Sequence, residues 1–126
     1  MRVARRKPTD AELTILRVLW ARGPSTVRHI TQVLGRDTGY TTVLKLLQIM
    51  TEKRLVRRDE SERTHVYEAA YTEGETQRQL VSDLLDRAFG GSAAKLVLQA
   101  LATRQSSPEE LAEIRKLIDK RRGGTR

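Results

Sequence analysis

The chain has 126 residues and a formal net charge of +8, with 24 Lys and Arg, 16 Asp and Glu, and no Cys. This length suits one ordinary domain or a small domain with an appendage, and the lack of Cys excludes a disulfide framework, a thiolate metal site and a catalytic thiol. The basic excess favours a polyanionic partner, and it lies mainly in residues 1–70, which hold 14 basic and 8 acidic side chains.

Two helices are predicted first. Thr9 and Glu12 have the spacing of a capping box, which predicts a helix over residues 10–22 that Gly23 and Pro24 end. Ser25 or Thr26 then caps a shorter helix that Gly35 ends. The apolar residues of this second helix fall on one face, which we expect to be buried; they are Val27, Ile30, Val33 and Leu34.

A third helix is predicted over residues 40–54. Its core stripe has helical spacing and consists of Val43, Leu46, Leu47 and Met50. The opposite side carries short or hydrogen-bonding side chains, which suit close approach to the edges of DNA bases. The DNA-binding candidates on this helix are Tyr40, Thr41, Thr42, Lys45 and Gln48. Taken alone, they are equally consistent with an ordinary solvated helix face.

After residue 54 the spacing of the apolar residues changes from that of a helix to that of β-strands. Residues 55–58 and 63–68 are predicted to form a β-hairpin, with a polar tip over residues 59–62. Three helices followed by a charged hairpin are typical of a winged helix-turn-helix. Arg57, Arg58 and Arg63 are the predicted wing contacts with the DNA backbone or minor groove. Because the tip is rich in carboxylates, we expect the tip itself to stay clear of DNA.

The rest of the chain is predicted to be helical and to mediate dimerisation. Capping boxes at Thr72 and Ser107, and a break at Gly90 and Gly91, predict three helices. The apolar stripes of these helices are too extensive to remain in water, so we expect them to be buried. Burial against a second copy of the chain is favoured over packing against the N-terminal domain. The predicted dimerisation residues are Val81, Leu84, Leu85, Phe89, Leu96, Val97, Leu101, Leu111, Ile114, Leu117 and Ile118.

The predicted fold class is therefore mainly α with a small β-hairpin wing. Residues 1–70 form a winged-helix DNA-binding domain, and residues 71–126 form a helical dimerisation region with a disordered basic tail over residues 121–126. Trp20 is interpreted as a core residue and His65 as a structural residue of the wing. A basic N-terminal arm is equally consistent with an electrostatic contact and with a frayed end; its cations are Arg2, Arg5, Arg6 and Lys7.

The chain resembles the penicillinase repressor, or BlaI/MecI, family from about residue 9 to residue 118. No single matching segment is diagnostic, but their order and spacing together are specific. The matching segments run over residues 12–20, 24–27, 40–50, 53–56, 65–67 and 89–92.

This resemblance implies a homodimeric winged-helix repressor that binds inverted-repeat operators. It also implies that Thr41, Thr42 and Lys45 contact bases or phosphates. Some members are released when a membrane sensor protease cuts them at an Asn-Phe bond. The corresponding stretch here is residues 98–101, and the chain has no Asn, so control by that cleavage is not expected. Without Cys, the copper sensing of another branch of the family is excluded.

Sequence-specific repression is the favoured function, and two other readings stay open. The chain could bind DNA without sequence preference, or it could be a winged helix that binds protein. An enzyme is not expected, because no nucleophile, base and orienting group occur together; no cofactor or metal is expected either. No apolar run approaches the ~20 residues of a membrane span, so no membrane insertion is predicted. The lack of Cys suits a reducing compartment, and a cytoplasmic location is predicted.

Overall fold

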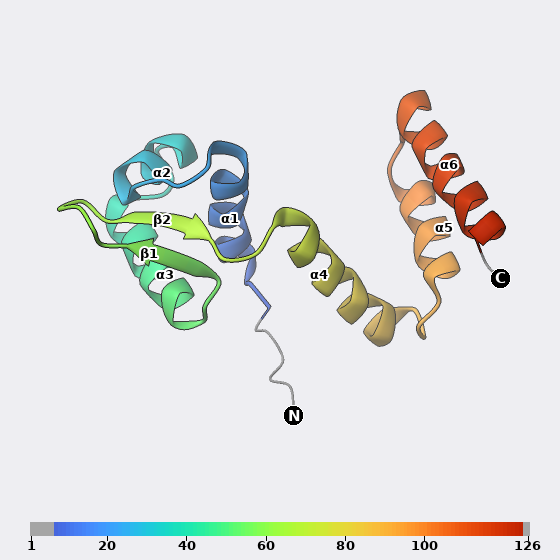
Figure 1. Ribbon diagram of the computed structural model, residues 1–126, viewed down its shortest axis with the longest axis horizontal. Coiled ribbons are helices and arrows are strands. Elements are labelled where there is room, and N and C mark those ends of the chain that lie inside the picture. The colour runs from blue at the N-terminus through green and yellow to red at the C-terminus, as the bar shows by residue number, and fades with distance from the viewer. Residues whose placement is uncertain (1–6, 125–126) are drawn as a thin grey trace. The chain divides into compact units, whose positions relative to one another are not determined.

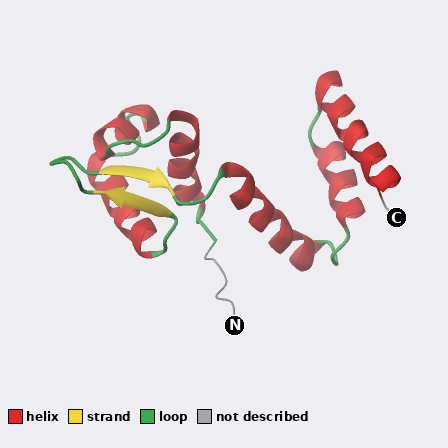
Figure 2. Cartoon of the chain, in the orientation of Figure 1, coloured by secondary structure: helices red, strands yellow, loops and turns green. Residues whose placement is uncertain are grey.

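The computed structural model describes residues 7–124, and the predicted arm residues Arg2, Arg5 and Arg6 lie outside them. Three helices come first: α1 (Asp10–Arg22), α2 (Val27–Leu34) and α3 (Tyr40–Glu52). The hairpin strands β1 (Val56–Asp59) and β2 (Val66–Ala69) follow, and then α4 (Glu73–Ala88), α5 (Ala93–Thr103) and α6 (Pro108–Gly124). This order confirms the predicted winged helix-turn-helix with C-terminal helices (Figures 1 and 2).

The predicted caps start the helices where the sequence placed them. In the capping box of α1, the Glu12 backbone N–H donates to Thr9 Oγ1 at 3.2 Å, and the Thr9 N–H donates to Glu12 Oε1 at 2.9 Å. Thr26, rather than Ser25, caps α2, because its Oγ1 accepts the His29 N–H at 3.1 Å. These side chains satisfy amide groups that have no partner in the first turn of a helix.

One core holds the three helices and the hairpin together. Ile30, Val43, Leu47 and Met50 are completely buried, and Tyr67 reaches this core from β2. Leu46 is only partly buried at the edge of the core. Val33, predicted to be buried, is 36% exposed, so that prediction is wrong. It lies near the end of a helix of eight residues and lines a surface groove.

The hairpin is anchored to the helices by a short stretch of backbone pairing. Arg57 lies opposite Glu68, and Arg58 lies opposite Tyr67. On the other side of β2, Ser25 and Tyr67 exchange two backbone hydrogen bonds of 2.9 and 2.8 Å. The turn between α1 and α2 therefore fixes β2, and the hairpin loop reaches beyond α2 and α3 (Figure 1). β1 has the predicted length but begins one residue later, at Val56, whereas β2 is shorter than predicted because it begins only at Val66.

Helix α3 ends at Glu52, before the predicted end at Arg54. Arg54 adopts a left-handed backbone conformation with φ of 65°, and the Leu55 N–H donates back to the Met50 carbonyl at 2.9 Å. A left-handed residue closes the last turn of a helix and turns the chain away from its axis. Here that turn leads directly into β1.

The chain divides into two compact units, with the boundary at Ser82 and Asp83. The boundary therefore lies inside α4, whereas the sequence placed it at residues 70 and 71. Helix α6 continues to Gly124, so the prediction of a disordered tail is wrong for residues 121–124; residues 125 and 126 are not described. In the described part of the chain, no helix combines the length and the apolar character needed to cross a membrane.

Candidate nucleic-acid interface

Helix α3 presents its predicted contact residues to solvent. Tyr40 is 52% exposed, and the other four candidates on this helix are also exposed: Thr41, Thr42, Lys45 and Gln48. The helix is held in this orientation because Val43, Leu47 and Met50 point into the core on its opposite side. A face of short hydroxyl, amide and amine groups on a fixed helix can form hydrogen bonds with base edges or phosphates.

Ile49 also lies on the exposed side of α3, and the sequence analysis did not select it. Its side chain is 37% exposed, and it follows Lys45 by one helical turn. The signal in the sequence was this four-residue spacing, since residues four apart share a helix face. An exposed aliphatic group at this place can contact the methyl group of a thymine in the major groove.

The arginines on β1 are already paired with carboxylates. Arg57 lies 3.5 Å from Glu68 on the opposite strand, and Arg58 Nε lies 2.6 Å from Glu60 Oε2. A hydrogen bond to Tyr67, together with the neighbouring Glu60 carboxylate, raises the pKa of the Arg58 guanidinium. Both cations are thus partly compensated within the hairpin.

The hairpin tip is stabilised by one of its own carboxylates. The Ser61 backbone N–H donates to Asp59 Oδ1 at 2.9 Å. Hydrogen bonds from Ser61 favour the charged form and lower the pKa of the Asp59 carboxyl. Arg63, on the returning side of the loop, is exposed and forms no ion pair with any residue between 7 and 124.

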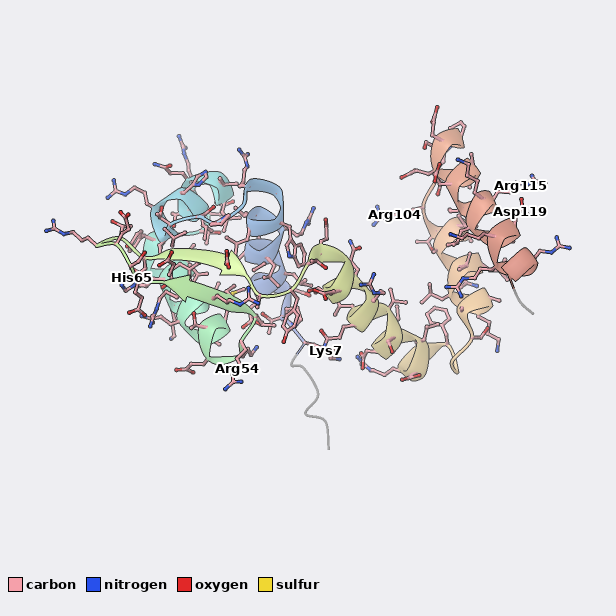
Figure 3. The ribbon with its side chains drawn as sticks, viewed as in Figure 1. Lys7, Arg54, His65, Arg104, Arg115 and Asp119 are labelled. Carbon is pink, nitrogen blue, oxygen red and sulfur yellow. The ribbon has the colours of Figure 1, made fainter. Side chains whose placement is uncertain are left out.

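A groove with a cavity volume of about 340 Å³ lies between the helices and the hairpin loop. Figure 3 labels one of its residues, His65, on the hairpin. The groove joins the start of α2 and the start of α3 to the loop. Only Tyr40 and Arg63 among its lining residues were predicted DNA contacts, and the polar residues Thr26, Arg28 and Thr64 were not. Its full lining is Thr26, Val27, Arg28, Tyr40, Leu44, Arg63, Thr64, His65 and Tyr67.

Trp20 packs against the core as predicted, and it is only half-buried. Its indole Nε1–H donates to the Tyr71 carbonyl oxygen at 3.0 Å, which joins α1 to the segment just before α4. Trp20 also lines a surface groove together with residues of α1, the end of α2 and Glu73. Trp20 is therefore a packing residue whose polar atom has a protein partner.

The second unit leaves its apolar side chains largely in solvent. No residue between 83 and 123 is buried in the single chain. Most predicted dimerisation residues are exposed, and four are partly buried: Leu85, Phe89, Leu96 and Ile114. Leu98 was not among the predicted residues, although at 65% it is the most exposed large apolar side chain between residues 7 and 124. Exposed apolar surface of this extent is typical of an interaction site.

Comparisons with known proteins identify the family. Residues 8–120 match the family described as penicillinase repressor. The chain is 31% identical over 113 residues to the transcriptional regulator BlaI of Mycobacterium tuberculosis, which covers 87% of this chain and 82% of the relative. It is 19% identical over 111 residues to the penicillinase repressor of Staphylococcus aureus, with 86% of this chain and 88% of the relative covered.

Among solved structures, the transcriptional regulator BldR from Sulfolobus solfataricus is similar with a TM-score of 0.41 and 15% identity. That likeness covers 86% of this chain and 74% of the other.

Proposed function

The chain belongs to the penicillinase repressor family of transcriptional regulators, and we propose that it is a dimeric, sequence-specific repressor that recognises an inverted-repeat operator. The family consists of repressors rather than enzymes, as the sequence analysis predicted. In this proposal α3 enters the major groove of the operator, and repression takes place in the cytoplasm.

The observation that carries this proposal is the solvent side of α3. Thr41, Thr42 and Lys45 are exposed on a helix whose other side is completely buried, so they can reach base edges without disturbing the core. Short side chains near the start of the helix let its backbone come close to the groove floor.

The dimer follows from the exposed apolar surface of the second unit. Val97, Leu101 and Leu117 are between 37% and 56% exposed, and burying such side chains against a second copy removes them from water. A two-fold dimer places two copies of α3 on two half-sites, and this symmetry matches an inverted repeat.

Cleavage by a sensor protease is not part of the proposal. The stretch that corresponds to the cleaved bond, residues 98–101, contains no Asn and lies within α5. Its backbone is held by helical hydrogen bonds, whereas proteolysis concentrates in exposed loops.

The test is selection of genomic DNA fragments by the purified protein at two salt concentrations, with the enriched fragments read by sequencing. Recovery of an inverted repeat, bound more weakly at higher salt, supports the proposal. Salt-sensitive binding with no enriched sequence supports a non-specific DNA-binding protein instead. If no fragment binds at either salt concentration, a protein-binding winged helix replaces both readings.

A further inference from the structure

We propose that the groove between α2, the start of α3 and the hairpin loop holds one phosphate group, with Arg28 and Arg63 as its cations. This inference rests on the proposed function, because it takes the phosphate to be one of the DNA backbone. The groove is lined by residues from three segments that are far apart in the sequence. It would thus clamp the backbone between the wing and the helix-turn-helix.

The lining has the chemistry of an anion site. Arg28 comes from α2 and Arg63 from the hairpin loop, and no carboxylate is among the nine lining residues. Four hydroxyl groups and an imidazole complete the polar part of the lining: Thr26, Thr64, Tyr40, Tyr67 and His65. Arginine is well suited to phosphate, because its planar group donates two parallel hydrogen bonds to two phosphate oxygens.

The contrast within the hairpin supports this assignment. Arg57 and Arg58 have carboxylate partners at 3.5 and 2.6 Å, and neither lines the groove. Arg28 and Arg63 do line it, and neither forms an ion pair with any described residue. Among the three arginines of the hairpin, only Arg63 has no carboxylate partner, and it is the one that lines the groove together with Arg28. The guanidinium groups of Arg28 and Arg63 repel each other because both are positive, and an anion bound between them offsets this repulsion.

Thr26 can take part without giving up its structural role. Its Oγ1 accepts the His29 backbone N–H at 3.1 Å as the cap of α2, and a hydroxyl that accepts one hydrogen bond still has its own O–H to donate. The same side chain can therefore cap the helix and bind a phosphate oxygen.

A small phosphorylated ligand would offer the same chemistry as the DNA backbone. The position of the groove favours DNA, because Tyr40 lines it and is followed directly by Thr41 and Thr42, the predicted base-contacting residues. A backbone phosphate held there would fix the register of α3 along the duplex, which is the usual role of phosphate contacts.

The experiment compares Arg28→Ala and Arg63→Ala with the control Arg17→Ala. Arg17 is an exposed arginine of α1, it does not line this groove, and its loss changes the charge equally. Affinity is measured over a range of salt concentrations for an enriched genomic fragment and for a random duplex of equal length.

Each groove variant is expected to bind both duplexes about tenfold more weakly. The slope of log affinity against log salt should fall by about one per protomer, while the control keeps the wild-type slope. The double variant should lose little more than either single variant, because both arginines hold the same phosphate. Additive losses in the double variant, or equal slopes in Arg28→Ala and Arg17→Ala, overturn the inference.

Inorganic phosphate tests whether the groove binds a small phosphorylated ligand instead of a phosphate of the DNA backbone. If millimolar phosphate shifts the backbone amide resonances of Thr26 and Thr64 while the DNA slopes of the groove variants stay unchanged, the groove binds a small ligand, and the DNA assignment is overturned. If the wild-type protein binds neither duplex, the proposed function fails, whereas wild-type binding with unchanged variants rejects only the groove assignment.

Discussion

Lys53 Nζ, at the end of α3, lies 2.9 Å from Oε1 and 3.0 Å from Oε2 of Glu12 in the first turn of α1. The Glu12 side chain is 2% exposed and the Lys53 side chain is 17% exposed. The same carboxylate accepts the Thr9 backbone N–H at 2.9 Å. One buried group therefore caps α1 and joins it to the end of the candidate recognition helix.

Replacing Lys53 with Met should destabilise the winged unit strongly. The substitution leaves the Glu12 carboxylate buried without its cation, and we expect a loss of about 3 kcal/mol in the free energy of unfolding. Urea unfolding followed by the fluorescence of Trp20, the one tryptophan in the sequence, measures it. The matched control is Lys116→Met, whose 3.4 Å pair with Glu113 is mostly exposed and should cost less than about 0.5 kcal/mol. Equal losses in the two variants would contradict the prediction.

Replacing Arg54 with Gly should stabilise the protein. Arg54 has a φ of 65°, a conformation that costs a residue with a Cβ roughly 1–2 kcal/mol and glycine almost nothing. Because glycine also makes the unfolded chain more flexible, we expect a net gain of about 0.5–1 kcal/mol in the same urea experiment. Arg54→Ala removes the same charge and keeps the Cβ atom, so it should bring no gain. If both variants were more stable than the wild type, the effect would come from the loss of the Arg54 charge and not from the backbone conformation.

Replacing Thr42 with Ala should reduce affinity for the operator more than affinity for random DNA. If the exposed hydroxyl and methyl of Thr42 contact a base, the loss on the operator is about 1–3 kcal/mol. Fluorescence anisotropy with an enriched fragment and a random duplex measures both affinities. Thr14→Ala is the control, because Thr14 is exposed on α1 and its hydroxyl donates to the Asp10 carbonyl. Equal losses on both duplexes would make Thr42 a phosphate contact.

Replacing Leu117 with Glu should dissociate the proposed dimer while the winged unit, which has its own core, stays folded. Leu117 is 56% exposed, so the charge is tolerated in the monomer, but in an apolar interface it would cost more than about 2 kcal/mol. Sedimentation velocity over a range of concentrations measures the dimer dissociation constant. Gln99→Glu adds the same charge at an exposed polar position of α5 and should leave the constant unchanged. A Leu117→Glu variant that remains dimeric would place the interface elsewhere.

The starts of helices were predictable because capping is local in sequence. Ser107 and Glu110 are three residues apart, and they exchange the two expected hydrogen bonds of 2.9 and 3.0 Å. Thr72 and Glu75 do the same at 2.8 and 3.1 Å. Both partners of such a pair lie within four consecutive residues, so the start of the helix can be predicted without knowledge of the tertiary fold.

Features that depend on distant segments were not predictable in this way. Glu12 was recognised as a cap, but its ion pair with Lys53, 41 positions away, follows only from the packing of α3 on α1. The groove unites Arg28 with Arg63 for the same reason, since it forms only once the hairpin is fixed against α2. Helical periodicity also placed Val33 in the core, although it cannot tell how far a core extends along a short helix.

No residue between 83 and 123 is buried in the single chain, so in the proposed dimer the folding of the second unit would depend on protein concentration. A segment that acquires its core only from another copy gains stability by mass action, so its ordered fraction rises with the amount of chain present. Below the dissociation constant of the dimer, each winged unit would meet DNA alone and lose the advantage of binding two half-sites at once. The protein abundance needed for repression would then be set by Leu98 and its apolar neighbours as well as by α3.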